Sequence, residues 1–246
     1  KDTSGVSVLF PSMTQVTELD VSDCGLGPTS MPELVKLVSD ARAALASLTV
    51  DSTGDMRWDT RGQKTYTLTV GDEALDLSQK NLGPVDVTVL SAWIQLPKIS
   101  AVTTSVNCLK NPLGDEGLAT LVTAVEASSV GSICGLTEGQ TTVEWSKQDL
   151  GPFDCKIISV DFGFRRFSAV LAHLDCSQNG TITGKRSRDN DNAAPWIYGE
   201  KMEGWVALCS ALPSTMISLD FSGIRRKRLR WQPYQSCNDY RSVARH

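Results

Sequence analysis

The chain offers few side chains of the kinds that carry out acid–base or nucleophilic chemistry. Its only histidines are His173 and His246, so few residues could act as the histidine base that activates a serine or cysteine nucleophile. The sequence contains no GxxxxGKS/T, HExxH, GxSxG or GxGxxG motif. His173 adjoins an apolar strand residue and is expected to face solvent. We therefore expect a protein that is not an enzyme and that uses no cofactor.

One loop has acidic residues at spacings that resemble a calcium site. Asp189, Asp191 and Glu200 occupy the first, third and twelfth positions of a loop of the EF-hand kind. Ala194, however, stands where the sharp turn requires glycine, and Ala193 supplies no side-chain oxygen. The pattern favours a polar surface loop, and we expect no metal site.

Acidic residues recur between apolar residues that have the alternation of a half-buried strand. Because successive strand residues point to opposite faces, these acids should point outward. Parallel strands lie about 4.8 Å apart, so the acids should form one row that attracts a basic partner surface; the alternative is a solvated face with no binding role. The row comprises Asp20, Thr49, Asp76, Thr103, Glu144, Asp175 and Asp220, beside a row of serines, Ser22, Ser78, Ser105, Ser146, Ser177 and Ser222.

Two long insertions, near residues 51–65 and 182–200, follow strand patterns directly. Trp58 lies in the first insertion and Trp196 and Tyr198 lie in the second, all near arginines. Trp, Tyr and Arg contribute most of the binding energy in protein interfaces, so we expect these aromatic residues to anchor a partner at the edge of the fold. The alternative is that they fold back and shield the apolar core.

An internal duplication predicts the elements that position these residues. Residues 75–87 read LDLSQKNLGPVDV and residues 143–155 read VEWSKQDLGPFDC, and residues 19–28, LDVSDCGLGP, belong to the same series. In each unit an apolar alternation predicts a strand, and an apolar pattern with helical spacing follows it. Asp86 is placed to cap one of these helices. The strands are centred on Leu19, Leu48, Leu75, Val102, Val143, Leu174 and Leu219.

A shorter pattern, LxxLxLxxNxL, lies within the duplicated units. It includes Cys24 in the first unit, Asn107 beside Leu109, and Asn179 five residues after Leu174. These residues resemble the leucine-rich repeat family, of the longer ribonuclease-inhibitor-like type. The resemblance implies an α/β leucine-rich-repeat solenoid, or horseshoe, with a parallel β-sheet on the concave face and helices on the convex face. It also implies that Asn107, Asn179 and Cys24 point inward and bond the turn backbone.

The resemblance implies a domain of about seven irregular repeats over residues 1–224. It further implies non-catalytic protein–protein binding through the concave face and the inserted edge loops. Two other roles stay open: a structural subunit of a large assembly, and a regulator of a small GTPase or another enzyme. We expect no membrane insertion, no nucleic-acid binding and no small-molecule substrate.

Charge is distributed unevenly along the 246 residues, of which 41% are apolar. The basic tail, residues 225–246, has seven basic residues and one acid, so its +6 leaves −10 for residues 1–224 out of a total of −4. An acidic body with a short basic tail disfavours general binding to nucleic acids. The tail could be a cap on the last repeat, a targeting signal, a minor nucleic-acid contact, or a peptide that folds against the acidic row.

The seven cysteines are widely spaced and include no CxxC pair. This usage indicates reduced thiols in an intracellular protein, most simply a cytoplasmic one. Cys24, Cys108 and Cys176 fall on core-facing positions, so we expect them to be unpaired and slow to react. Because the chain begins at Lys1 and not at methionine, we expect a fragment or a processed form, from which a targeting segment could be missing.

Overall fold

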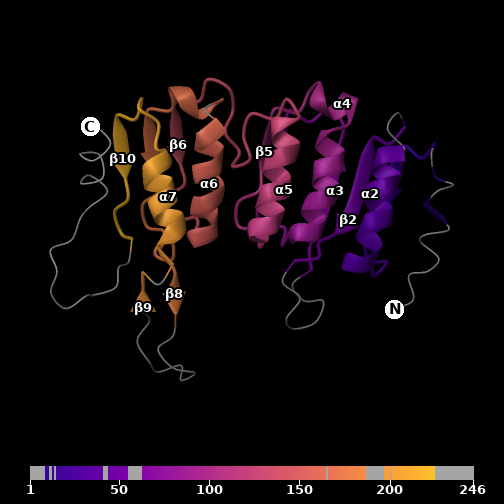
Figure 1. Cartoon of the computed structure of the whole chain (residues 1–246), viewed down its shortest axis with the longest axis horizontal. Coiled ribbons are helices and arrows are strands. Elements are labelled where there is room, and N and C mark those ends of the chain that lie inside the picture. The colour runs from indigo at the N-terminus through magenta and orange to yellow at the C-terminus, as the bar shows by residue number, and fades with distance from the viewer. Residues whose placement is uncertain are drawn as a thin grey trace. The chain divides into compact units, whose positions relative to one another are not determined.

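The computed structural model describes residues 9–10, 13, 15–40, 44–54, 63–164, 166–186, 197–199 and 201–224 (Figure 1). The side chains of residues 185–186 and 197–198 are outside this description. The chain divides into two compact units, Lys1–Thr137 and Glu138–His246. Each unit is described by itself.

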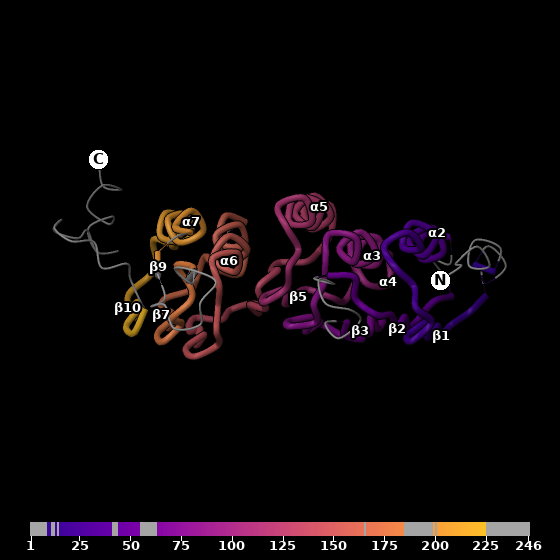
Figure 2. Tube along the Cα trace, turned by 90° about the horizontal axis from the view of Figure 1, so that it is seen from below, coloured from indigo at the N-terminus to yellow at the C-terminus, as the bar shows by residue number. Residues whose placement is uncertain are grey.

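The first unit alternates short strands with helices. Strands β1 and β2 pair in parallel, β3 pairs antiparallel with β2, and β4 and β5 form a separate parallel pair. Helices α2, α3 and α5 lie together on one side of the strands (Figure 2). In chain order the elements are β1 (Glu18–Asp20), the 3-10 turn η2 (Pro28–Ser30), α2 (Met31–Asp40), β2 (Ser47–Asp51), β3 (Thr65–Thr69), β4 (Ala74–Asp76), α3 (Pro84–Ile94), α4 (Pro97–Ser100), β5 (Ser105–Asn107) and α5 (Gly114–Glu126).

The second unit is built around a three-stranded parallel sheet. Strand β7 is central, with β6 and β10 on either side of it. Helices α6 and α7 pack against each other on one side of this sheet (Figures 1 and 2). The elements are β6 (Thr142–Glu144), α6 (Pro152–Phe164), the 3-10 turn η4 (Ser168–Val170), β7 (His173–Asp175), β8 (Lys185–Arg186), β9 (Ile197–Tyr198), α7 (Glu203–Ala211) and β10 (Ser218–Asp220).

The predicted single parallel sheet of a horseshoe solenoid is wrong. The described strands form separate small sheets, β1–β2–β3, β4–β5, β6–β7–β10 and the antiparallel pair β8–β9. Part of the insertion near residues 51–65 is the cause in the first unit, because it ends in a strand where we expected a loop. That strand, β3, pairs with the free edge of β2 and takes the place that β4 would need in a continuous sheet.

The duplication predicted from the sequence is visible in the local structure of each unit. Helices α3 and α6 both begin at the proline of a Gly-Pro pair, where the missing N–H costs no helical hydrogen bond. The N–H of Gly83 donates to Asp86 Oδ2 over 2.7 Å, and the N–H of Gly151 donates to Asp154 Oδ2 over 2.7 Å. The predicted helix cap at Asp86 is therefore confirmed.

The turns after the strands also repeat. Positive φ angles are uncommon outside glycine because they bring Cβ close to the backbone. Several such residues nonetheless occur in pairs that are 68 positions apart, the offset of the duplicated sequences. These pairs are Gln79 and Lys147, Asn81 and Asp149, and Lys110 and Gln178.

A buried asparagine stabilises the turn in each unit. Asn179, which was predicted to point inward, is fully buried. Its Oδ1 accepts from the N–H of Leu150 over 3.1 Å, and its Nδ2 donates to the carbonyl of Trp145 over 2.7 Å. The prediction for Asn179 is confirmed.

The same prediction is wrong for Asn107, because Asn111 fills this role in the first unit. Asn111 Oδ1 accepts from the N–H of Leu82 over 3.0 Å, and its Nδ2 donates to the carbonyl of Leu77 over 2.8 Å. The error is one of register: the core residue of β5 is the fully buried Val106 and not Val102, which is 40% exposed.

Candidate functional site

The predicted row of outward residues is divided among different sheets. In the first unit Asp20 lies on β1 and Asp76 on β4, which belong to separate sheets. In the second unit Glu144, Asp175 and Asp220 lie on β6, β7 and β10, which are neighbours in one sheet. The structure therefore brings together three of the five acids, and we call Glu144, Asp175 and Asp220 the acidic row.

The acidic row is aligned by the strand register. Glu144 is the direct partner of Asp175 across β6 and β7, and Asp220 is the direct partner of Asp175 across β10 and β7. Neighbouring parallel strands are about 4.8 Å apart, so the three side chains leave the same face at that spacing. Glu144 and Asp220 are exposed and Asp175 is partly exposed. The exposed His173 lies two residues before Asp175, on the same face of β7, where it was predicted to face solvent.

Two members of the acidic row are oriented by the backbone of the following turn. Asp175 Oδ1 accepts from the N–H of Ser177 over 2.7 Å, and Asp220 Oδ1 accepts from the N–H of Ser222 over 2.7 Å. Each bond closes a turn of the Asx type, which fixes the carboxylate close to the strand end. The acids thus have a local structural role in addition to their charge. One oxygen of each aspartate is engaged in this turn.

The outward position on β5 was assigned to the wrong residue. Thr103 is fully buried, and its hydroxyl donates to the carbonyl of Asp72 over 2.7 Å. Asn107 occupies the outward position instead, and its Oδ1 accepts from the N–H of Leu109 over 3.2 Å. The signal that could have identified Asn107 is the duplication, since Asn107 lies 68 residues before Asp175.

The predicted serine row is not a uniform exposed surface. Ser105 begins β5 and is 1% exposed, because of the same register error, and Ser177 is 5% exposed. Ser22, Ser78 and Ser146 are partly exposed, and Ser222 is exposed. Four of them donate a turn N–H to the strand carboxylate two residues earlier, and they do not form a continuous binding surface: Ser22, Ser78, Ser177 and Ser222.

The predicted aromatic anchors cannot be placed beside the acidic row. Trp58 and Trp196 lie outside the described residues, and Tyr198 belongs to β9 with its side chain outside the description. The calcium-like residues Asp189, Asp191 and Glu200 lie outside the described ranges too. Predictions about these residues stay predictions.

The described residues contain no group of three or more His, Cys, Asp and Glu side chains arranged to hold a metal ion. The acidic row and the neighbouring His173 are among these residues and do not form such a group with one another. Over the same residues, no helix combines the length and the apolar character needed to cross a bilayer.

The cysteine predictions are partly confirmed. Cys108 and Cys176 are free and fully buried, and burial, with a smaller effect of Asp175, raises the pKa of Cys176 to about 12. Cys24 is also free but is exposed, since it follows the edge strand β1. Cys209 is disulfide-bonded, which contradicts the expectation that all seven thiols are reduced.

Hydrogen bonds to a buried carboxylate fix the first insertion at its base. Asp86 Oδ2 accepts from the N–H and the hydroxyl of Thr53 over 2.8 and 2.9 Å, and Asp86 Oδ1 accepts from the hydroxyl of Tyr66 over 3.3 Å. Thr53 lies near the start of the insertion of residues 51–65, and Tyr66 directly follows its last residue. Burial raises the pKa of Asp86, and it raises the pKa of Tyr66 well above its usual value. The helix cap of α3 therefore also holds both ends of the insertion.

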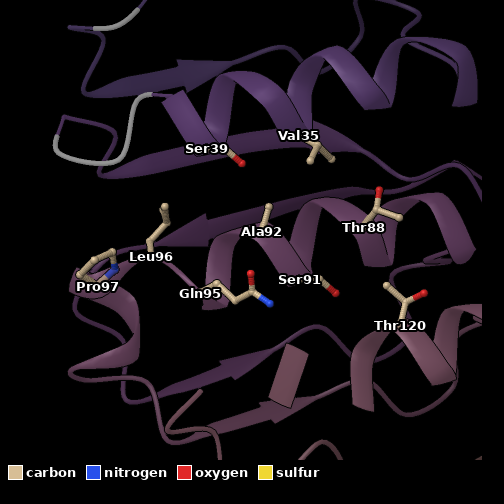
Figure 3. A pocket seen from close by; sticks show the side chains of 9 residues that line it. All are labelled: Val35, Ser39, Thr88, Ser91, Ala92, Gln95, Leu96, Pro97 and Thr120. Atoms are coloured by element: carbon tan, nitrogen blue, oxygen red, sulfur yellow. The ribbon is translucent and has the colours of Figure 1, made fainter. Parts of the chain in front are cut away.

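A pocket of about 370 Å³ lies on the helical side of the first unit (Figure 3). Val35 and Ser39 of α2 face Ala92 of α3 across it, and Ser91 of α3 points toward Thr120 of α5. The Ser91 hydroxyl is buried without a hydrogen-bond partner. No ionisable side chain lines the pocket, so it supplies no group for acid–base catalysis.

No protein-family model matches the chain, and no curated protein matches it significantly.

Proposed function

We propose that this chain is a non-catalytic protein that binds a partner protein with a basic surface through the acidic row. The observation that carries the proposal is the direct register of Glu144, Asp175 and Asp220 on three neighbouring strands. Like charges placed directly opposite each other destabilise a sheet. At a spacing of about 4.8 Å the repulsion is about 1 kcal/mol per pair in water. A cationic partner relieves that repulsion, which favours its binding.

The charge of the rest of the chain supports the same partner. Residues 1–224 carry a net charge of −10. A net negative body with acids concentrated on one sheet face attracts cationic surfaces over distances longer than a contact, and this raises the association rate more than the final affinity. The insertion that contains Trp196 and Tyr198 belongs to the same unit as the acidic row and is proposed to add apolar contacts. Of the two roles left open above, a structural subunit would instead be held by its inserted edge loops, and an enzyme regulator is a special case of the same partner binding.

The test neutralises the acidic row without changing its shape. The triple variant Glu144→Gln, Asp175→Asn and Asp220→Asn removes three negative charges and keeps the oxygen that accepts from the turn N–H groups. The control variant Glu116→Gln, Glu126→Gln and Glu138→Gln removes the same charge from exposed positions elsewhere. A fluorescent decalysine peptide serves as the cationic probe, and its association rate is measured by stopped flow at low salt.

We expect the triple variant to associate at least five-fold more slowly than the wild-type chain and the control variant to associate nearly as fast as the wild type. The difference reports the position of the charges, since both variants have the same net charge. Proteins captured by the wild type and by the control, but lost from the triple variant, then identify the natural partner. Equal slowing of both variants would show that only net charge matters, and the acidic row would be a solvated face.

A further inference from the structure

The last strand of the second unit leaves apolar side chains uncovered. Strand β10 pairs with β7 along one edge, and no described strand pairs with its other edge. Ile217, just before β10, is 75% exposed, and Val206 on α7 is 42% exposed. Leu219 and Phe221 are only partly buried. We call Trp205, Val206, Ile217, Leu219 and Phe221 the end face.

The other strands of the same sheet show that these positions belong to the core. Val143 of β6 and Leu174 of β7, the register equivalents of Leu219, are each 2% exposed. Cys176, two residues after Leu174 as Phe221 is two residues after Leu219, is fully buried. The apolar side chains of the last strand are therefore core residues that, within the described part of the second unit, lack a neighbouring strand on one side. Natural proteins rarely leave both an apolar patch and a strand edge open to water.

Two aromatic rings form the centre of the end face. The ring of Phe221 meets the ring of Trp205 on α7 edge to face, with centroids 4.6 Å apart. Both residues are partly exposed. Aromatic rings bury more apolar area per residue than other side chains, so the end face can bind a further aromatic or aliphatic segment strongly.

The chain itself continues from this face. The last described residue is Ile224, four positions after the end of β10, and residues 225–246 follow. That segment contains the apolar residues Leu229, Trp231 and Tyr234 among its basic ones. Its 22 residues could reach about 70 Å if fully extended, far more than a three-residue strand and one helix require.

The cysteines point to the same segment. Cys209 lies on α7, which contributes two residues to the end face, and it is disulfide-bonded. Of the seven cysteines in the chain, Cys24, Cys108, Cys134, Cys155 and Cys176 take part in no disulfide. The one cysteine left is Cys237, which belongs to residues 225–246.

We propose that residues 225–246 fold back over the end face, with Leu229 and Trp231 against Leu219 and Phe221, and that a disulfide joins Cys209 to Cys237. Formation of the disulfide removes one hydrogen from each thiol. A disulfide oxidant such as oxidised glutathione accepts both, and it leaves as two molecules of the reduced thiol. The sequence leaves several roles open for the basic tail, and this proposal selects one of them: the tail is a cap on the end of the second unit.

A second copy of the chain is the competing occupant. A segment attached four residues from the face acts at an effective concentration of about millimolar, whereas a second copy is present at its solution concentration. At micromolar protein, residues 225–246 of the same chain therefore bind the end face in preference to a second copy, and the capped chain is a monomer.

The test uses the full chain, purified without reductant. The variant Leu229→Asp with Trp231→Asp places charges in the proposed apolar contact. The control Gln232→Asp with Gln235→Asp adds the same charge to the same segment but keeps Leu229 and Trp231. Hydrogen exchange of residues 215–224 is followed by mass spectrometry, with helix α6 as the reference for a folded second unit.

We expect exchange at residues 215–224 to be at least ten-fold faster in the first variant than in the wild type, with α6 unchanged and the control like the wild type. Peptide mapping of the wild type under non-reducing conditions should recover Cys209 linked to Cys237, a result that does not depend on whether any variant folds. Equal exchange in the wild type and the first variant, or a free thiol at Cys237, overturns the proposal. A wild-type dimer that Ile217→Asp dissociates overturns it as well, since a second copy would then cover the face.

Discussion

At the scale of the residue, one asparagine in the first unit carries several backbone hydrogen bonds. Asn111 accepts from the N–H of Leu82 and donates to three carbonyls, whereas Asn107 accepts one bond, from the N–H of Leu109. Each buried group left without a partner costs about 1–3 kcal/mol. We expect Asn111→Ala to lower the free energy of unfolding in urea by 3 kcal/mol or more, on the order of two lost partners. Asn107→Ala should lower it by about 1 kcal/mol.

Equal losses for these two variants would contradict the register of β5. A larger loss for Asn107→Ala would restore the register predicted from the sequence, in which Asn107 is the inward residue.

A second prediction concerns the buried carboxylate at the start of α3. Burial raises the pKa of Asp86 despite the hydrogen bonds from Gly83, Thr53 and Tyr66. A raised pKa in the folded state means that the folded protein binds the proton more tightly than the unfolded chain. This contribution to stability is complete below about pH 4, the unfolded value, and is lost as the pH rises through the folded pKa. The stability of the wild type relative to Asp86→Asn should therefore fall from pH 4 to pH 7.

Urea unfolding of both proteins across this pH range measures the difference. Tyr66→Phe is the matched variant, because it removes a hydrogen bond that lowers the pKa of Asp86. In Tyr66→Phe the pKa of Asp86 should be higher still, so the loss of stability with rising pH should extend to higher pH than in the wild type. If the difference in the free energy of unfolding between the wild type and Asp86→Asn stays constant with pH, the pKa of Asp86 is not raised in the folded protein.

At the scale of the element, the contact between α6 and α7 depends on a glycine. A Cβ placed on Gly204 would collide with the carbonyl of Pro152, which is backbone and cannot move aside. Overpacking of this kind costs about 1–3 kcal/mol, so Gly204→Ala should lower the stability of the second unit by that amount. Gly163 on α6 is the control, because a Cβ there meets nothing within 4 Å. Gly163→Ala should raise stability by about 0.5–1 kcal/mol.

Thermal unfolding of the two alanine variants checks this pair. If Gly204→Ala is as stable as the wild type, the two helices are not in the close contact described for them.

At the scale of the whole molecule, the charge distribution predicts how partner binding depends on salt. The screening length is about 10 Å at 0.1 M salt and about 3 Å at 1 M, so attraction by the acidic body should weaken steeply over that range. For the decalysine probe, we expect the ratio of the association rates of the wild type and the triple variant to fall from about five at low salt to nearly one at 1 M salt. Rates measured from 20 mM to 1 M salt test this. A difference that persists at high salt would indicate contacts other than charge.

Part of the fold could be read from the sequence because it depends on local interactions. The Gly-Pro pairs, Asp86 and the apolar periodicity predicted where strands and helices begin, since capping and amphipathic burial involve residues a few positions apart. The inward role of Asn179, in contrast, was expected from the resemblance to leucine-rich repeats and not from these local rules. The acidic residues of β6, β7 and β10 were placed correctly on an outward face because side-chain alternation is a property of a single strand.

The partners of each strand were decided only by the tertiary structure. The sequence predicts an insertion over residues 51–65 and no strand directly after it, but residues 65–69 form β3 on the free edge of β2, and the first sheet ends there. The register of β5 differs in one respect, because the duplication does record it: Val106, and not Val102, lies 68 residues before Leu174. A short strand pattern can be read in more than one register, and pairing with its neighbour selects one. Hydrogen bonds between residues far apart in the chain thus decided which acids share a sheet, and no local pattern in the sequence records those bonds.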